Sequence, residues 1–191
     1  MAEEQEKLTA GQELRQDLYY WLQALVAALI AIVLIFTFVG RIIGVSGSSM
    51  VPTLHNRDMM VVRSIGYTPR QGDVVVLNKL STDFLGGEAI VKRVIAVGGQ
   101  VVDIDYENNV VTVDGVPMEE DYINLAESDP MEDLGTITHL EVPEGSIFVM
   151  GDNRNHSTDS RSPSLNVIDE RYVIGKVEWV IFPISSFGAV E

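Results

Sequence analysis

Three short segments of the 191-residue chain carry side chains that could act together in catalysis. In the first, residues 47–54, Ser49 follows Gly47 and Ser48, which are small enough to let a backbone or a substrate approach closely. The segment lacks the Gly-x-Ser-x-Gly pattern that exposes the serine of α/β-hydrolases. A Gly-Ser run is also typical of an ordinary loop. Ser49 is therefore a candidate nucleophile only if a base lies beside it.

The second segment, residues 90–95, places a lysine among apolar residues. On an extended strand, Ile90, Lys92 and Val94 share one face, whereas Arg93 points the other way. A free lysine has a pKa of about 10.4, but burial disfavours the ammonium and lowers that pKa by ~3–5 units. A neutral Lys92 could then accept a proton from a serine hydroxyl. In the alternative, its stem lies on the core and its ammonium reaches water.

The third segment, residues 150–161, contains two aspartates and two arginines. These charges predict a loop held by ion pairs, because Arg–carboxylate pairs fix geometry. Arg154 falls at a ligand position of an EF-hand loop, which excludes that kind of calcium site. His156 is an alternative base, and the only other histidines are His55 and His139.

Composition excludes several classes of function. The chain has 28 acidic and 13 basic residues, a formal net charge of −15, so a nucleic-acid-binding surface is not expected. It has no cysteine, which excludes disulfides, thiolate metal sites and cysteine nucleophiles. Serine and lysine thus remain the strongest candidates for chemistry.

A membrane anchor precedes these segments. Residues 22–39 form an uncharged stretch that would span roughly 27 Å as a helix, close to a hydrocarbon core of ~30 Å. Aromatic residues 19–21 lie at its entry, and Thr9 with Gln12 fits a capping box, so the helix should begin near residue 10. The stretch is too long, and its preceding segment too acidic, for a removable secretory signal. A buried core helix is the other alternative.

Beyond the anchor, the pattern predicts a mainly β fold. Short runs rich in β-branched residues alternate with turn residues, and the predicted strands are 59–62, 73–77, 89–91, 101–104, 110–113, 147–150 and 178–182. Residues 101–113 read as a hairpin, and Asp114-Gly115 marks another turn. Residues 101–144 form an acidic excursion from this core, since no Lys or Arg occurs between Arg93 and Arg154. It could be a solvated face or a contact surface for basic partners or a divalent ion.

Together the three segments resemble the motifs of bacterial type I signal peptidases, membrane-bound Ser-Lys proteases that remove signal peptides from exported proteins. The motifs occur in the family's order behind one N-terminal span, as in the short Gram-positive form. The resemblance implies a cytoplasmic tail at 1–18, a single transmembrane helix at 19–40 and an extracytoplasmic antiparallel β peptidase domain at 41–191. Charges flanking the span do not decide this orientation. No metal or cofactor is implied.

The resemblance also assigns roles to the reacting residues. Ser49 matches the nucleophile and Lys92 the general base. The Ser49 backbone N–H would be one oxyanion donor, and Gly47 stands where some relatives carry a serine hydroxyl as the second donor. Backbone or water would have to replace that hydroxyl. A second departure is Gly98-Gly99-Gln100, where relatives often read Pro-Gly-Asp.

Supporting residues come from the third segment. Ser157 matches a hydroxyl that orients the lysine. Asp159 and Arg161 match a buried ion pair, and we expect Asp152 in the same network.

The substrates implied are signal peptides with small residues, usually Ala-x-Ala, before the cut. We expect shallow pocket walls from residues that border the motifs: Met50, Pro52, Leu54 and Val91. A monomer in contact with the lipid bilayer is expected. The alternatives are a narrow-specificity peptidase, for pilins for example, and an anchored non-catalytic β domain. Self-cleaving Ser-Lys repressors carry a DNA-binding domain and no span, the reverse of this chain.

Overall fold

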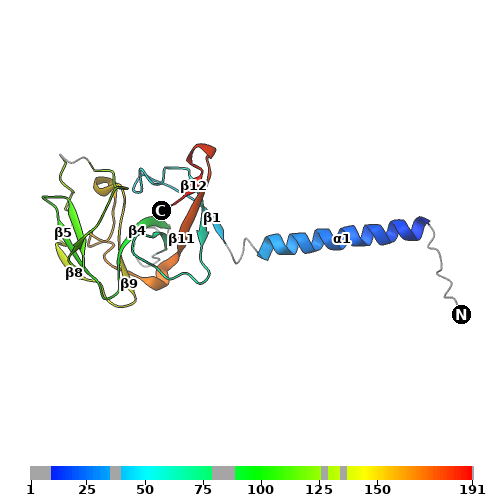
Figure 1. The fold of residues 1–191 in the computed structure, drawn as a ribbon, viewed down its shortest axis with the longest axis horizontal. Coiled ribbons are helices and arrows are strands. Elements are labelled where there is room, and N and C mark those ends of the chain that lie inside the picture. The colour runs from blue at the N-terminus through cyan, green and yellow to red at the C-terminus, as the bar shows by residue number, and fades with distance from the viewer. Residues whose placement is uncertain (1–9, 35–39, 79–88, 126–128, 134–136, 191) are drawn as a thin grey trace. The chain divides into compact units, whose positions relative to one another are not determined.

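The computed structural model describes residues 10–34, 40–78, 89–125, 129–133 and 137–190. The chain divides into two compact units, residues 1–39 and 40–191 (Figure 1). In the first unit, helix α1 (Ala10–Leu34) has a stretch, Gly11–Leu34, that is long and apolar enough to cross a membrane. The helix is described from residue 10 onward, and the predicted capping residue Thr9 and residues 35–39 lie outside the described residues.

The second unit is built from two antiparallel sheets, which confirms the mainly β prediction. The larger sheet has the order β1-β2-β11-β3-β4-β9-β10, with β12 paired to β11. Its strands are β1 (Arg41–Gly44), β2 (Met59–Arg63), β3 (Val74–Leu77), β4 (Ile90–Val97), β9 (Ser146–Met150), β10 (Ile168–Asp169), β11 (Val173–Phe182) and β12 (Gly188–Ala189). Three 3₁₀ turns connect its later strands: Arg154–His156, Glu170–Tyr172 and Ile184–Ser186.

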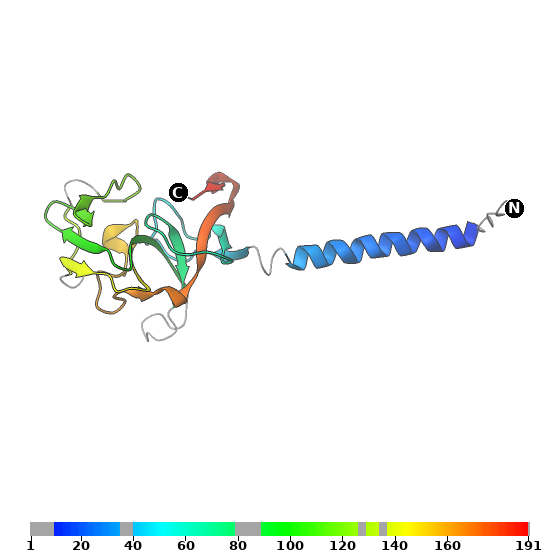
Figure 2. The ribbon, with the colours of Figure 1, turned by 60° about the horizontal axis from the view of Figure 1, so that its bottom comes forward.

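The smaller sheet lies within the acidic excursion. Its order is β7-β6-β5-β8, with strands β5 (Val101–Asp105), β6 (Val110–Val113), β7 (Val116–Pro117) and β8 (His139–Glu141). The predicted hairpin is confirmed, since β5 and β6 pair from Val102↔Val113 to Asp105↔Val110. The predicted second turn is also present: Asp114 and Gly115 have φ of 53° and 77° and connect β6 to β7. Figures 1 and 2 show β5 and β8 at the opposite end of the second unit from β1 and β11.

Every predicted strand overlaps an observed one, but two of the observed strands are much longer than predicted. The predicted strand 89–91 is part of β4, which continues to Val97, and the predicted strand 178–182 is the second half of β11. Both are central strands of the larger sheet. Because each pairs with a neighbour on both sides, its extended backbone continues through residues of low strand propensity, such as Gly175 and polar residues. The sequence patterns missed β1, β7, β8, β10 and β12, each only two to four residues long.

Three buried clusters stabilise the second unit. One contains Met50, Leu54 and Val91, and packs β2 against the loop that follows β1. A second lies between the two sheets around Phe148 and Val102. The third lies around Val75, Val94, Ile147 and other residues of the larger sheet.

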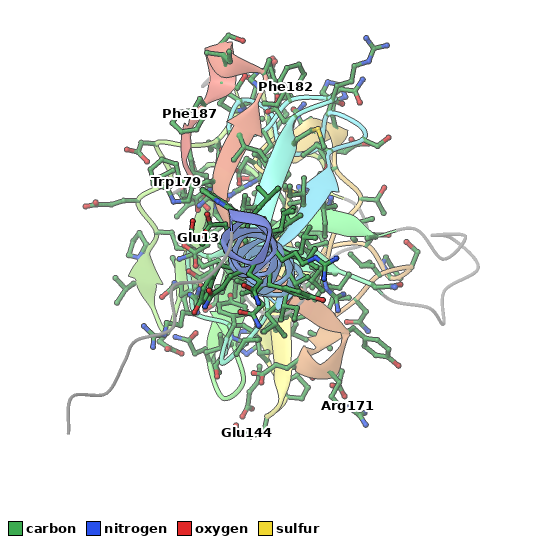
Figure 3. The ribbon with its side chains drawn as sticks, turned by 90° about the vertical axis from the view of Figure 1, so that its right-hand side faces the viewer. Glu13, Glu144, Arg171, Trp179, Phe182 and Phe187 are labelled. Atoms are coloured by element: carbon green, nitrogen blue, oxygen red, sulfur yellow. The ribbon has the colours of Figure 1, made fainter. Side chains whose placement is uncertain are left out.

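One part of the second unit leaves large apolar side chains exposed. Trp179, Phe182, Ile184 and Phe187 are 46–85% exposed, and the Trp179 and Phe187 rings lie 5.7 Å apart. Figure 3 shows Trp179, Phe182 and Phe187 on one side of the unit, away from Glu144 and Arg171.

Candidate active site

Ser49 lies in a turn that follows β1 and is fastened to the 151–161 loop. Gly47 takes a φ of 98°, a conformation that glycine adopts without strain, just before the turn. The Ser49 carbonyl accepts a hydrogen bond from the Asn153 backbone N–H (3.0 Å), and the Asn153 side chain donates to the Ser48 carbonyl (3.0 Å). The first and third sequence segments are therefore in direct contact.

Lys92 is brought to Ser49 by β4. Its Nζ lies 2.8 Å from Ser49 Oγ and 2.9 Å from the Val91 carbonyl oxygen, and the residue is only 3% exposed. Burial lowers the pKa of Lys92 to about 8, although the negative charges of Asp159 and Asp152 act in the opposite direction. A substantial fraction of Lys92 is therefore neutral near that pH and can take the Ser49 proton.

Ser157 packs against Gly151, on which the Ser49 carbonyl also packs. The residue is buried, and within the described parts of the chain its Oγ has no hydrogen-bond partner. A Cβ on Gly151 would lie 2.3 Å from Ser157 Oγ and 2.5 Å from the Ser49 carbonyl oxygen. Gly151 therefore packs directly between these two serines. Orientation of Lys92 by the Ser157 hydroxyl stays a prediction.

Asp159 and Arg161 form an ion pair that is completely buried. Arg161 Nε and Nη2 donate to the two Asp159 oxygens at 2.8 and 2.9 Å. Asp159 also accepts the Gly151 backbone N–H at 3.0 Å, and Arg161 donates to the Arg154 carbonyl at 2.6 Å. The pair holds the start and the end of the 151–161 loop together.

Asp152 makes its own ion pair and has no direct bond to Asp159 or Arg161 among the described contacts, so its supporting role stays a prediction. It pairs with Arg93, whose Nε and Nη2 donate to its two oxygens at 2.9 and 2.8 Å, and it also accepts the Thr53 hydroxyl. The Arg93 guanidinium stacks on the Tyr122 ring, 3.9 Å from its centroid. Lys92 and its neighbour Arg93 thus have different partners, since only Arg93 has a carboxylate as hydrogen-bond partner among the described residues.

The expectation that the loop's charges pair with one another is only half right. Arg154 pairs with Glu120 of the acidic excursion, not with an aspartate of the loop. Sequence reasoning missed Arg93, Thr53 and Glu120. The one available signal was the alternation on the strand, which turns Arg93 away from Lys92.

The histidines lie outside this arrangement. His156 and His55 are exposed, and His139 pairs with Asp103 on the smaller sheet. The alternative base, His156, therefore lacks the burial that Lys92 has. No group of three or more potential metal-ligating residues occurs among the described residues.

A cavity of about 130 Å³ opens beside Ser49 and Lys92. Its walls are residues 43–47, Val76 and residues 89–91. Two of the expected wall residues, Met50 and Val91, line it. The other two do not: Leu54 is fully buried in the core and Pro52 is exposed.

Comparison with known proteins assigns the family. A sequence model described as "Signal peptidase, peptidase S26" matches residues 18–182. The "Probable signal peptidase I-1" of Synechocystis sp. is 34% identical over 171 residues, covering 86% of this chain and 82% of its own length.

Gram-positive relatives match over most of their length. The signal peptidase I of Bacillus licheniformis is 32% identical, covering 90% of this chain and 92% of its own. A crystal structure of a signal peptidase I from Enterococcus faecalis V583 covers 58% of this chain and 97% of its own, with a TM-score of 0.47 and 26% identity, so the assignment stands on the sequence matches alone. Those matches, which extend through all three motif segments, show that the chain belongs to the signal peptidase family, peptidase S26.

Proposed function

We propose that this protein is a membrane-bound signal peptidase I that cuts exported preproteins by a Ser-Lys mechanism. The observation that carries the proposal is the 2.8 Å contact between Ser49 Oγ and the buried Lys92 Nζ, at the edge of a small cavity. Membership of the peptidase family supports the class of reaction. No metal or cofactor enters the proposed reaction.

The reaction begins with proton transfer within this pair. Neutral Lys92 accepts the Ser49 proton, and Ser49 Oγ attacks the carbonyl carbon at the cleavage site. The Ser49 backbone N–H donates a hydrogen bond to the resulting tetrahedral oxyanion. Lys92 then gives its proton to the leaving amine, which leaves an acyl-enzyme on Ser49. In the second half, Lys92 takes a proton from a water molecule, and that water attacks the ester carbonyl. The acyl group leaves as the product acid, and Lys92 returns its proton to Ser49 Oγ, which restores the starting state.

The second oxyanion donor is not a side chain at position 47. Gly47 carries none, and its backbone N–H donates to Asn56 Oδ1 at 3.3 Å. A water molecule or another backbone N–H would complete the oxyanion site.

The cavity supports a preference for small residues. Strand β4 pairs with β3 from Ile90 to Arg93 but with β9 only from Arg93 onward, so along 90–92 the described strands leave one edge open beside the cavity. An extended peptide could add along this edge with alternate side chains entering the cavity. The small volume favours alanine at those positions, as in the Ala-x-Ala sequences expected of the substrates.

Membrane attachment and orientation complete the proposal. In this proposal helix α1, which is long and apolar enough to cross a membrane, is the anchor. The N-terminus lies in the cytoplasm, and the peptidase unit lies outside as a monomer. The exposed Trp179, Phe182, Ile184 and Phe187 suit contact with the apolar part of a membrane. Protease treatment of intact spheroplasts tests the orientation: residues 41–191 should be digested, and their protection would reverse it.

The central experiment is cleavage of a purified preprotein in detergent, with the new N-terminus read by mass spectrometry. Wild type should cut after Ala-x-Ala, and Ser49→Ala and Lys92→Ala should both abolish the cut. If Lys92→Ala stays active, another residue must be the base, and His156 would be tested first. Absence of wild-type cleavage on several preproteins would favour a narrow-specificity peptidase or a binding module.

A further inference from the structure

Glu120 reaches out of the acidic excursion into the ion-pair network of the candidate site. Its two carboxylate oxygens accept hydrogen bonds from Arg154 Nη2 (2.5 Å) and Nη1 (3.0 Å). The Glu120 side chain is 7% exposed and the Arg154 side chain 1%. A bidentate pair at this depth fixes both the position and the plane of the guanidinium.

Arg154 is in turn connected to both ends of the 151–161 loop. Its Nε donates to the Gly151 carbonyl at 3.1 Å, and its own carbonyl accepts the 2.6 Å hydrogen bond from Arg161. Arg161 holds Asp159, and Asp159 holds the Gly151 N–H. The Glu120 carboxylate, which also accepts the Tyr122 hydroxyl at 3.2 Å, therefore belongs to a continuous chain of contacts that closes on Gly151.

A shift of Gly151 would move Ser49 and Ser157, because there is no free space around the Gly151 Cα. It lies against the Ser49 carbonyl and Ser157 Oγ, where even a methyl group would overlap both. Other contacts join the same two regions: the Asn124 N–H donates to the Asp152 carbonyl, and the Glu132 N–H donates to Asn155 Oδ1, both at 2.8 Å. The acidic excursion thus packs on the loop along its length, and Glu120 supplies the one buried charge pair between them among the described ion pairs.

We propose that Glu120 is a positioning residue for the peptidase reaction, which acts through Arg154 on the loop that seats Ser49. The inference rests on the proposed function. Without the carboxylate, Arg154 keeps a buried positive charge, and the other carboxylate whose charge acts on it is Asp159. Competition between Arg154 and Arg161 for Asp159 would release the Gly151 N–H and loosen the seat of Ser49.

The test uses the full-length chain in detergent with a matched pair of substitutions. Glu120→Gln removes the charge but keeps the shape, and Glu119→Gln makes the same change at the exposed neighbouring residue. We expect Glu120→Gln to lower kcat on a preprotein about 10- to 100-fold, with KM changed less than about twofold, because a misplacement of 1 Å costs ~10²-fold in rate. Glu119→Gln should keep wild-type kcat. Glu120→Asp, which keeps the charge, should recover part of the loss.

Two further measurements separate positioning from general destabilisation. Amide hydrogen exchange of residues 151–161 should accelerate in Glu120→Gln while the strands of the larger sheet keep wild-type exchange. Arg154→Gln should lower kcat at least as much as Glu120→Gln, and the double variant should be no slower than Arg154→Gln alone.

The proposal is overturned if Glu120→Gln keeps wild-type kcat and wild-type amide exchange of residues 151–161. It is also overturned if the kcat losses of Glu120→Gln and Arg154→Gln add in the double variant, or if amide exchange rises equally in every strand. If Glu120→Gln does not fold, the comparison of Glu120→Asp with wild type decides: unchanged kcat and loop exchange overturn positioning. If wild type cuts no preprotein, the proposed function fails, while the exchange measurement still supports or overturns the Glu120 contact chain.

Discussion

Two lysines of the larger sheet have opposite surroundings, although both are register partners of Val75. Lys176 keeps 26% of its side chain exposed and lies 2.6 Å from an Asp73 carboxylate oxygen. Lys92 is 3% exposed and contacts only a hydroxyl and a carbonyl among its described hydrogen-bond partners. A carboxylate in contact stabilises the ammonium, whereas burial without one favours the neutral amine. Burial without a carboxylate in contact therefore lowers the pKa of Lys92.

Removing each lysine gives the largest expected difference. Lys92→Met should lower kcat/KM for preprotein cleavage by about 10⁴-fold or more, the scale seen when a member of a catalytic unit is removed. Lys176→Met loses only a partly exposed ion pair and should keep activity within about threefold. Cleavage rates in detergent measure both, and circular dichroism checks that each variant is folded. Equal losses would show that Lys92 has no special role.

Gly151 and Gly188 form a second contrast. Gly151→Ala would place a methyl group 2.5 Å from the Ser49 carbonyl oxygen, so Ser49 must shift and the rate should fall about 10²-fold. The new methyl group of Gly188→Ala would have no atom of the described residues within 4 Å, apart from its chain neighbours, so this change should be neutral. Kinetics of acylation at Ser49 by a serine-reactive probe give the comparison. Full reactivity of Gly151→Ala would mean that the Ser49 turn moves independently of the 151–161 loop.

The pH profile follows from the lowered pKa of Lys92. In the proposed mechanism the neutral amine is the active form, so kcat/KM should level off above a pH of about 8 and fall about tenfold per pH unit below it. The Lys176→Met variant should show the same profile, because Lys176 does not take part. Rates measured from pH 6 to 10 on one preprotein test this, and a rate independent of pH below 8 would rule out Lys92 as the titrating base.

The smallest effect concerns the cavity walls. Val91→Ala enlarges the cavity and should reduce discrimination against residues larger than alanine by about tenfold, the scale of one or two methylenes. Leu54 lies in the core behind the site, so Leu54→Ala should lower the free energy of unfolding by about 2–5 kcal/mol. It should not change the discrimination against residues larger than alanine. Competing preproteins that differ at the cleavage site measure the first, and denaturant unfolding the second. A change of specificity in Leu54→Ala alone would reverse the two roles.

Local pattern was sufficient for much of the fold. Runs such as residues 74–77 and 110–113 become strands because β-branched side chains favour extended backbone, and Asp114-Gly115 supplies the positive φ of a tight turn. The order of the sheet could not be read in this way. Strand β11 lies between β2 and β3, a long-range pairing that no local pattern encodes.

In the candidate site, too, local sequence pattern predicted some residues, whereas long-range contacts could not be predicted. Ser49 and Lys92 could be predicted because motifs with family resemblance surround each of them. The partners of Arg93 and Arg154 could not, because they lie 59 and 34 residues away and the chain offers 28 acidic residues. Only the packing of the acidic excursion against the 151–161 loop selects Glu120.

The burial of positive charge around the site has a consequence for proteolysis. From residue 80 to residue 170 the only lysines and arginines are Lys92, Arg93, Arg154 and Arg161, all at most 3% exposed. Trypsin cleaves after these two residue types, so the folded chain offers it no accessible bond across this whole stretch. Tryptic cutting there requires the loop or β4 to open, and its rate reports directly how often the site comes apart.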